Sequence, residues 1–298
     1  MRCARAMSAD AFPIVRTMVL ESATRPSGPY SLRLSARLAS DATRTFRSGR
    51  LSTVLPSGEL ACAWQRPDGI VVVKAESEDG LERMRFVLGL DDDHSEFLER
   101  FAGDPVIGRA TRVLKGLRPL RLATVAHALL RGLAGQLVTW QHAKEIERDV
   151  IRRTTARHSC GLHEPPTGET LGRLGTAELR KLGLHARRAA ALVRLCRSVD
   201  LERLHALPTY SIVKRLGREP GIGPWSAGVV CLQGLGRTEQ GLVGDLGLIK
   251  ILSPVGGRRV DPAETAALLE PYGEWAGLAS VYMLTGLGRG LISFPEAA

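Results

Sequence analysis

The spacing of hydrophobic and polar residues changes once along the chain. Between residues 30 and 88 the two kinds alternate in short runs, which is typical of half-buried strands. The alternating runs are 30–35, 60–64 and 69–74, and the turn-rich stretches between them include 55–58 and 66–69. This part of the chain therefore predicts an antiparallel sheet with one or two helices.

From about residue 95 onward the spacing becomes helical. Residues 127–131 and 141–153 are amphipathic, and Thr176 is placed as the N-cap of a helix with an acidic first turn. In the segment 187–197, four apolar residues follow the i, i+3, i+4, i+7 spacing of one helix face: Ala189, Leu192, Val193 and Cys196. We expect an α+β protein, with a strand-rich region at residues 1–95 and an all-helical region at 96–298.

Positive charge is concentrated in the predicted helical region. Residues 1–100 carry 14 basic and 14 acidic side chains, whereas residues 105–218 carry 22 and 8, within a net charge of +10. A one-sided basic segment attracts a polyanion by counterion release, but basic charge also occurs in proteins that bind no nucleic acid. Charge alone therefore leaves nucleic-acid binding open.

Several other classes are disfavoured by the sequence. No stretch reaches the ~18–20 uninterrupted apolar residues of a membrane helix, and the start of the chain lacks the apolar region of a signal peptide. The cysteines have no paired spacing typical of zinc or iron–sulfur sites: they are Cys3, Cys62, Cys160, Cys196 and Cys231. The acidic residues 91–93 lack the glycine and terminal glutamate of a calcium loop. We expect buried, reduced thiols, no metal, no cofactor and a soluble cytoplasmic protein.

The most informative segment is 212–231, which contains the sequence PGIGPW at 220–225. A helix is expected to end at Gly217, and a second to begin at Pro224, because proline suits the first helical turn. Glycines around one apolar residue let a partner approach the backbone, and the amides that start the next helix can bind an anion. An ordinary helical corner with Ile222 in the core is the alternative for this turn.

A single carboxylate follows in the segment 241–250. Asp245 stands at the start of an apolar helix, in a region that is otherwise basic. Its position suits plain N-capping, in which the side chain accepts a backbone N–H. Asp245 follows the glycine turn by about twenty residues. Because the two features occur together, a role for Asp245 in a functional site is the second interpretation.

Together these segments resemble the helix-hairpin-helix superfamily of base-excision DNA glycosylases, and most closely its 3-methyladenine DNA glycosylase II branch. The matching segments are 220–227 (PGIGPWSA), 244–248 (GDLGL), 133–139 (LAGQLVT), and 166–167 leading to 179–184 and 187–189. The resemblance spans roughly residues 105–290. It implies a TATA-binding-protein-like N-terminal domain before an all-α core, and a double-stranded DNA partner bound by a monomer.

The resemblance also implies roles for individual residues. Gly221, Ile222 and Gly223 would hold a DNA phosphate, and Gln136 would contact the DNA. Leu137 would fill the gap left by a flipped base, although a core leucine on a helix is an equal alternative. Asp245 would stabilise the positive charge that develops on the sugar as the base leaves, as a carboxylate does in glycoside hydrolysis.

Trp225 decides the type of reaction that the resemblance implies. Bifunctional relatives carry a lysine at this position, and its amine forms a Schiff base and cuts the strand. A tryptophan cannot do so, which predicts base removal without strand cleavage. Trp225 would also line the base pocket, where an aromatic face suits an electron-poor alkylated purine. Trp275 and Tyr282 are further pocket candidates, for which a place in the core is the favoured alternative.

Two alternatives stay open at this stage. A glycosylase for an oxidised or deaminated base would share Asp245 and differ in its pocket. A non-catalytic helix-hairpin-helix DNA-binding protein would keep the hairpin, but a carboxylate near phosphate would weaken such binding. The chain has four tryptophans and four tyrosines, so an aromatic-rich pocket, and with it the identity of the damaged base, is not assured.

Overall fold

The computed structural model describes residues 19–136, 138–253, 260–261 and 263–293. Five antiparallel strands form one sheet in the order β1-β5-β4-β3-β2. Their bounds are Leu20–Thr24 (β1), Arg44–Arg47 (β2), Arg50–Val54 (β3), Leu60–Gln65 (β4) and Val71–Ala75 (β5). The two runs expected at 60–64 and 69–74 are confirmed, and the α+β class is confirmed with them.

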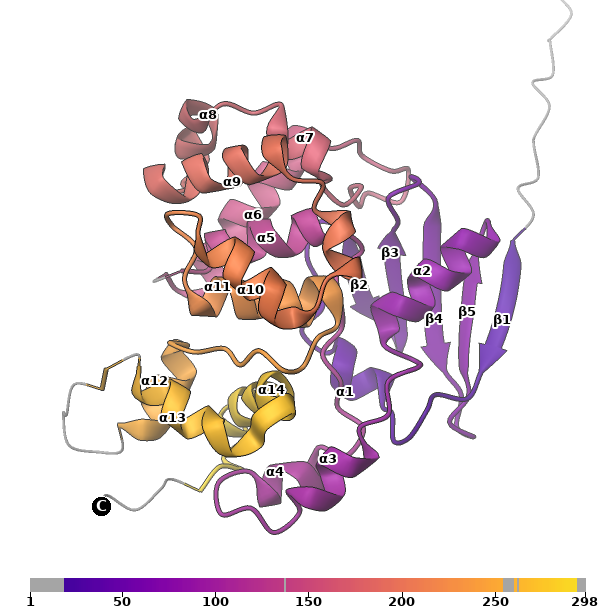
Figure 1. The fold of residues 1–298 in the computed structure, drawn as a ribbon. Coiled ribbons are helices and arrows are strands. Elements are labelled where there is room, and N and C mark those ends of the chain that lie inside the picture. Colours follow the sequence, from indigo (N-terminus) through magenta and orange to yellow (C-terminus); the bar gives the residue numbers. More distant parts are fainter. Residues whose placement is uncertain (1–18, 137, 254–259, 262, 294–298) are drawn as a thin grey trace, which may run out of the picture.

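Tight turns and one helix complete the sheet region. Gly58 and Gly69 turn the chain with φ of 85° and 87°, a region that glycine enters without strain. Helix α2 (Glu78–Leu88) crosses one face of the sheet, as Figure 1 shows. Its buried Met84, Val87 and Leu88 pack into the same core as the inward residues of β3, β4 and β5.

The strand expected at 30–35 is wrong. This segment contains helix α1 (Leu32–Ala36), because Ser31 caps it and accepts a hydrogen bond from the Leu34 backbone N–H. Leu32 and Ala36 are the buried residues of the helix and stand four positions apart, a spacing that places both on one helix face. A local cap therefore overrides a short alternating pattern.

The remaining elements of the described residues are helices. Their bounds are Ser95–Arg100 (α3), Gly108–Val113 (α4), Val125–Ala134 (α5), Trp140–Thr154 (α6), Gly168–Gly172 (α7), Thr176–Lys181 (α8), Ala186–Ser198 (α9), Glu202–Ala206 (η1), Thr209–Gly217 (α10), Pro224–Val229 (α11), Val230–Leu235 (η2), Leu246–Leu252 (α12), Glu264–Leu269 (α13), Glu270–Trp275 (η3) and Ala276–Leu287 (α14). The expected N-cap at Thr176 is wrong by one residue: Gly175 is the cap, and its N–H donates to Glu178.

Among the described residues these helices build two large cores, and Val229, Leu232 and Leu242 form one small cluster. One large core contains buried residues of α5 to α11 and η2. The other unites α3 and α4 with the C-terminal helices α12, α13 and α14, and these elements lie together at the bottom of Figure 1. The second core thus contains helices from two separate parts of the chain, α3–α4 and α12–α14. The segment between η2 and α12 connects the first core to the second.

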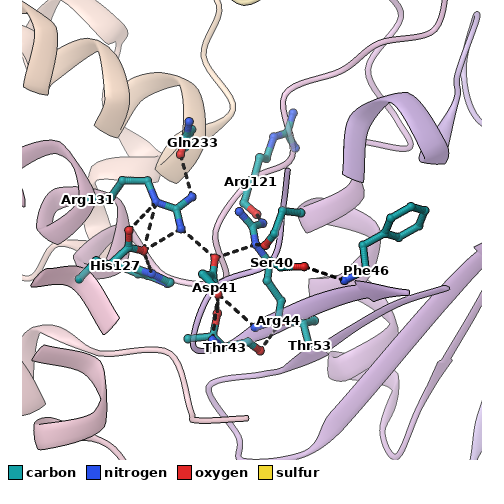
Figure 2. A network of polar contacts seen from close by, with 12 residues as sticks. Ser40, Asp41, Thr43, Arg44, Phe46, Thr53, Arg121, His127, Arg131 and Gln233 are labelled. Carbon is teal, nitrogen blue, oxygen red and sulfur yellow. Dashed lines mark hydrogen bonds and ion pairs between the residues drawn. The ribbon is translucent and has the colours of Figure 1, made fainter. Parts of the chain in front are cut away.

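A buried ionic network fastens α5 and α6 to the sheet region, as drawn in Figure 2. The Arg131 guanidinium of α5 donates to Asp41 Oδ2 at 2.8 Å and to Glu147 Oε1 of α6 at 2.7 Å. His127 Nε2 lies 2.6 Å from Glu147 Oε1, and Arg44 donates to Asp41 at 3.0 Å. Buried charges are tolerated when they are paired in this way.

The network sets the protonation of its acids. Burial alone would raise the pKa of Glu147, but the Arg131 charge and the His127 contact outweigh it and lower that pKa to about 2. The pKa of Asp41 is also lowered, because Arg44 and Arg131 overcome its burial. Both carboxylates are therefore ionised at neutral pH.

The expectation that the cysteine thiols are buried is correct for only some of them. Cys231 is buried, Cys62 and Cys196 are partly buried, and Cys160 is exposed, while Cys3 lies outside the described residues. Burial raises the pKa of both Cys196 and Cys231 to about 12, which keeps these thiols protonated. None of the helices in the described part of the chain is long and apolar enough to cross a membrane.

Candidate active site

The turn at 217–224 connects α10 to α11 as the sequence predicts. Gly221 has a φ of 108°, and the Ile222 N–H donates to Glu219 O at 3.0 Å. The Ile222 side chain is buried in the first helical core, so only its backbone can face a partner. Gly223 is the N-cap of α11, and a Cβ added there would meet open space. The turn thus combines a side chain fixed in the core with a backbone open to approach.

Gln136 binds this hairpin to the end of α5. Its Nε2 donates to Gly221 O at 3.0 Å and to Ser226 Oγ at 2.5 Å. Ser226 Oγ in turn donates to Gly132 O of α5 at 2.9 Å. The segment after α5 and the hairpin therefore lie side by side, although 85 residues separate Gln136 from Gly221.

Trp225 and Asp245 meet beside this hairpin. The indole Nε1 donates to Asp245 Oδ2 at 2.8 Å, and the Gly247 N–H donates to Oδ1 at 2.7 Å as Asp245 caps α12. Both side chains are partly buried. Two donors and a helix N-terminus stabilise a negative charge at this position. The capping interpretation of Asp245 is confirmed, and the cap leaves the carboxylate next to an aromatic ring.

The loop that carries Asp245 is held at several points. Gly228 of α11 allows the close approach of Gly241 O, which would lie 2.7 Å from a Cβ at position 228. The Gly244 N–H donates to Thr265 Oγ1 at 2.7 Å, and the Leu242 N–H donates to Ser280 Oγ at 3.1 Å. These contacts fix the carboxylate where the two helical cores meet.

Apolar groups surround the pair. A Cβ at Gly135 would lie 2.5 Å from the Trp225 ring, so the ring packs directly on the end of α5. Leu284 of α14 contacts Gly247, and Leu246, which follows Asp245, is 49% exposed. Neither leucine has a role predicted from the sequence: Leu246 lies inside the matching segment 244–248 without a role of its own, and Leu284 reaches the site only through the packing of α14.

The other aromatic candidates pack elsewhere. Tyr282 is fully buried, donates its hydroxyl to Leu114 O and Leu117 O at 3.2 Å, and has a pKa raised by burial. It stands two residues before Leu284, so it faces away from Gly247. Trp275 packs against His94 and Phe97. The core alternative fits both residues, and we leave them out of the pocket. Leu137 lies outside the described residues.

Basic side chains flank the hairpin. Lys214, Arg215 and Arg218 are exposed at the end of α10, and exposed Arg187 of α9 lies against Gly221. Long-range attraction of an anion to this surface is expected from their charge.

One cluster has the composition of a metal site. Ligand atoms of Asp41, His127 and Glu147 lie within 4.8 Å of one another. The Arg131 guanidinium donates to both carboxylates, at 2.8 and 2.7 Å, and so supplies the positive charge that a metal ion would bring. The cluster is therefore explained as part of the ionic network.

Sequence comparison finds relatives of one kind, although no family model matches the chain. A DNA-3-methyladenine glycosylase of Bacillus subtilis is 24% identical over 205 residues, which cover 65% of this chain and 67% of that protein. A Mycobacterium tuberculosis protein described as "Probable bifunctional transcriptional activator/DNA repair enzyme AlkA" is 27% identical over 281 residues. That match covers 86% of this chain but 56% of the mycobacterial protein.

Solved structures share the fold. A 3-methyladenine DNA glycosylase from Archaeoglobus fulgidus matches with a TM-score of 0.75 at 20% identity, covering 89% of this chain and 97% of the other. An 8-oxoguanine glycosylase/lyase of Clostridium acetobutylicum, in complex with double-stranded DNA, matches with a TM-score of 0.73 at 16% identity, covering 91% and 98%. At these identities the similarity establishes the fold alone. The type of reaction has to be inferred from the residues of the candidate site.

Proposed function

We propose that the chain belongs to the helix-hairpin-helix superfamily of base-excision DNA glycosylases, and that it removes damaged bases from DNA without cutting the strand; its similarity to DNA glycosylases in sequence and in fold supports this proposal. The substrate that we propose is an alkylated purine in double-stranded DNA. The sequence relatives carry the names of 3-methyladenine glycosylases or of a DNA repair enzyme. The observation that carries the proposal is the hydrogen bond between Trp225 and Asp245 beside the hairpin.

Asp245 is the proposed catalytic residue. Loss of a base breaks the bond between its nitrogen and C1′ and leaves positive charge on the sugar. An ionised carboxylate beneath the sugar lowers the energy of that charge, while water attacks C1′ and completes hydrolysis. An alkylated purine carries positive charge, so it leaves as a neutral base and needs little help from an acid. The Gly247 N–H and the Trp225 N–H hold the carboxylate in one orientation.

We propose that the hairpin binds the DNA. The backbone of Gly221, Ile222 and Gly223 would take a phosphate, and such a contact positions the duplex without reading its sequence. Exposed Lys214, Arg215 and Arg218 would add attraction that weakens with salt. We also propose that residues 1–95 form a TATA-binding-protein-like domain ahead of a glycosylase region at 96–298, and that Leu137 enters the gap left by the flipped base.

Trp225 supports a hydrolytic reaction. It occupies the position at which bifunctional relatives carry the Schiff-base lysine, and an indole N–H is not a nucleophile. Its ring forms one wall of the proposed base pocket against Gly135, and its aromatic face attracts a cationic base. A glycosylase for an oxidised or deaminated base would use the same carboxylate, and a non-catalytic binding protein would use the hairpin alone.

The proposal is tested with methylated duplex DNA and two proteins, the wild type and Asp245→Asn. The variant keeps the size of the side chain and one acceptor oxygen but removes the charge. We expect the wild type to release 3-methyladenine or 7-methylguanine, detected by mass spectrometry, and Asp245→Asn to lose at least about 100-fold in rate, since one electrostatic contact of this kind supplies several kcal/mol. Strand breaks should appear only after hot alkali. Equal activity of the two proteins would refute the role of Asp245.

A further inference from the structure

Trp140 is an exposed aromatic residue that the proposed chemistry does not use. It is the first residue of α6, and its side chain is 58% exposed. A large apolar ring in water is unfavourable, because its surface stays uncovered. Three residues at the start of the helix, Gln141, His142 and the cap Thr139, are also exposed, so nothing in the described chain covers the ring from that side.

A fixed cation lies over the ring. The Lys144 ammonium lies 4.0 Å from the centre of the Trp140 ring, one helical turn further along α6. The same ammonium donates to Ser40 O of the sheet region at 2.8 Å. A cation over the face of an indole is attractive, and here the cation is itself fixed. Trp140 is therefore more than half exposed, while a cation that is itself fixed lies over its ring.

The position of Trp140 is close to the candidate active site. Gln136, which binds the hairpin at Gly221 O and Ser226 Oγ, precedes Trp140 by four residues. Four Cα–Cα steps span at most about 15 Å, the length of a few nucleotides along a strand. The supported ring is thus within reach of DNA that is gripped by the hairpin.

We propose that Trp140 stacks on a base that becomes unstacked in the bound DNA beside the flipped nucleotide. The proposal rests on the proposed function, since it needs DNA on the hairpin. Flipping a nucleotide breaks stacking on both strands, and an aromatic side chain replaces such contacts with any base. A protein partner is disfavoured, because a specific interface buries about 800 Å² on each side and the ring is a single exposed residue.

Tyr210 provides a matched control. It is also exposed, at 74%, and carries a lysine over its ring, Lys214 at 5.7 Å. It stands near the start of α10, and the hairpin follows the opposite end of that nine-residue helix. The preceding segment contacts α2 of the sheet region through His205 and Phe86. Tyr210 therefore has the same chemistry on another part of the surface.

The test measures binding to a duplex that carries one uncleavable abasic-site analogue. Fluorescence anisotropy of labelled DNA gives the Kd for the wild type, Trp140→Ala, Trp140→Phe and Tyr210→Ala. Stacking on one base is worth about 1–3 kcal/mol, so Trp140→Ala should weaken binding roughly 5- to 150-fold. Trp140→Phe should stay within about threefold, because a ring remains, and Tyr210→Ala should bind like the wild type.

A second readout reports stacking itself. A 2-aminopurine placed opposite or beside the abasic analogue loses fluorescence when an aromatic ring stacks on it. The wild type should quench one of these positions and Trp140→Ala should not. Unchanged affinity and unchanged quenching in Trp140→Ala would overturn the proposal, even while wild-type base release upheld the proposed function. If the wild type neither bound this duplex nor released any base, the proposed function itself would fail.

Discussion

At the scale of single residues, the site depends on a hydrogen bond between an indole and a carboxylate. Trp225 does two things in the structure: its ring packs on Gly135, and its N–H holds Asp245 Oδ2 at 2.8 Å. The ring can be kept while the donor is removed. Substitution by phenylalanine therefore separates the wall of the proposed pocket from the orientation of the carboxylate.

We predict that Trp225→Phe lowers the single-turnover rate of base release by about 10- to 160-fold. A hydrogen bond to a charged group is worth about 1.5–3 kcal/mol, and each 1.36 kcal/mol changes a rate tenfold. Affinity for an abasic-site duplex should change little, because the hairpin is intact. The rate is measured with enzyme in excess over DNA. An unchanged rate would mean that the Gly247 N–H alone orients Asp245.

Much of the residue-level picture follows from local sequence. The turn glycines and the proline at the start of α11 are specified by neighbours within a few positions, and so is the cap at Asp245, which explains why these features are confirmed. Tyr282 and Trp275 could not be separated from pocket residues in this way. Whether an aromatic ring faces a core or a pocket depends on helix packing, which brings in α4 and α3 from far along the chain.

At the scale of elements, Gln136 connects the end of α5 to the hairpin. The resemblance assigns this residue to DNA contact, whereas its side chain donates to Gly221 O and Ser226 Oγ in the structure. Both roles are compatible only if DNA meets another part of the side chain. A comparison of stability and affinity distinguishes them.

We predict that Gln136→Ala lowers the free energy of unfolding by about 1–3 kcal/mol, because it removes the donor from the partly buried Gly221 O and from the hydroxyl of buried Ser226. Affinity for DNA should fall as well, since the turn is less well held. Urea denaturation and anisotropy on the same preparations measure the two effects. Weaker binding at unchanged stability would instead assign Gln136 to direct DNA contact.

Element boundaries show what sequence patterns miss. The segment 30–35 alternates like a strand, yet Ser31 caps a short helix there. Strands β1, β2 and β3 carry weaker patterns and gain their place through pairing with β5 and β4, as well as with each other. Leu20 of β1 pairs with Ala75 of β5, which lies 55 residues away, so short-range patterns cannot specify such partners.

At the scale of the whole molecule, the ionic network around Arg131 joins the sheet region to the helices. Asp41 and Arg131 are 90 residues apart, and no motif in the sequence predicts their contact. Arg131 also donates to Gln233 Oε1 of η2 at 3.1 Å. One guanidinium therefore holds α5, α6, η2 and the loop before β2, and α5 leads directly to Gly135 and Gln136 at the site.

We predict that stability falls steeply in acid. Glu147 has a pKa lowered from 4.5 to about 2 in the folded protein. A carboxyl with a lowered pKa contributes stability that is fully present above its unfolded pKa and is lost as pH falls through its folded pKa. The free energy of unfolding should therefore decline between about pH 5 and pH 2. Urea denaturation at a series of pH values measures this decline.

Substitution of the same residue provides the control. Glu147→Gln should cost about 3–5 kcal/mol at pH 7, because it removes one partner of a buried ion pair, and it should flatten the decline in acid. Glu145→Gln on the same helix, with a 61% exposed side chain, should change stability by less than about 0.5 kcal/mol. If both variants changed the free energy of unfolding by a similar, small amount, the ionic network would not stabilise the fold as proposed.

The most direct test of the central claim uses a duplex with one 7-methylguanine at a known position. Wild type, Asp245→Asn and Trp225→Phe are each incubated with it under single-turnover conditions, with and without borohydride. We predict that the wild type yields alkali-dependent cleavage at that position and no borohydride-trapped complex, and that Asp245→Asn yields no cleavage while still binding an abasic-site duplex. A trapped complex, or cleavage by Asp245→Asn at the wild-type rate, would contradict hydrolysis directed by Asp245.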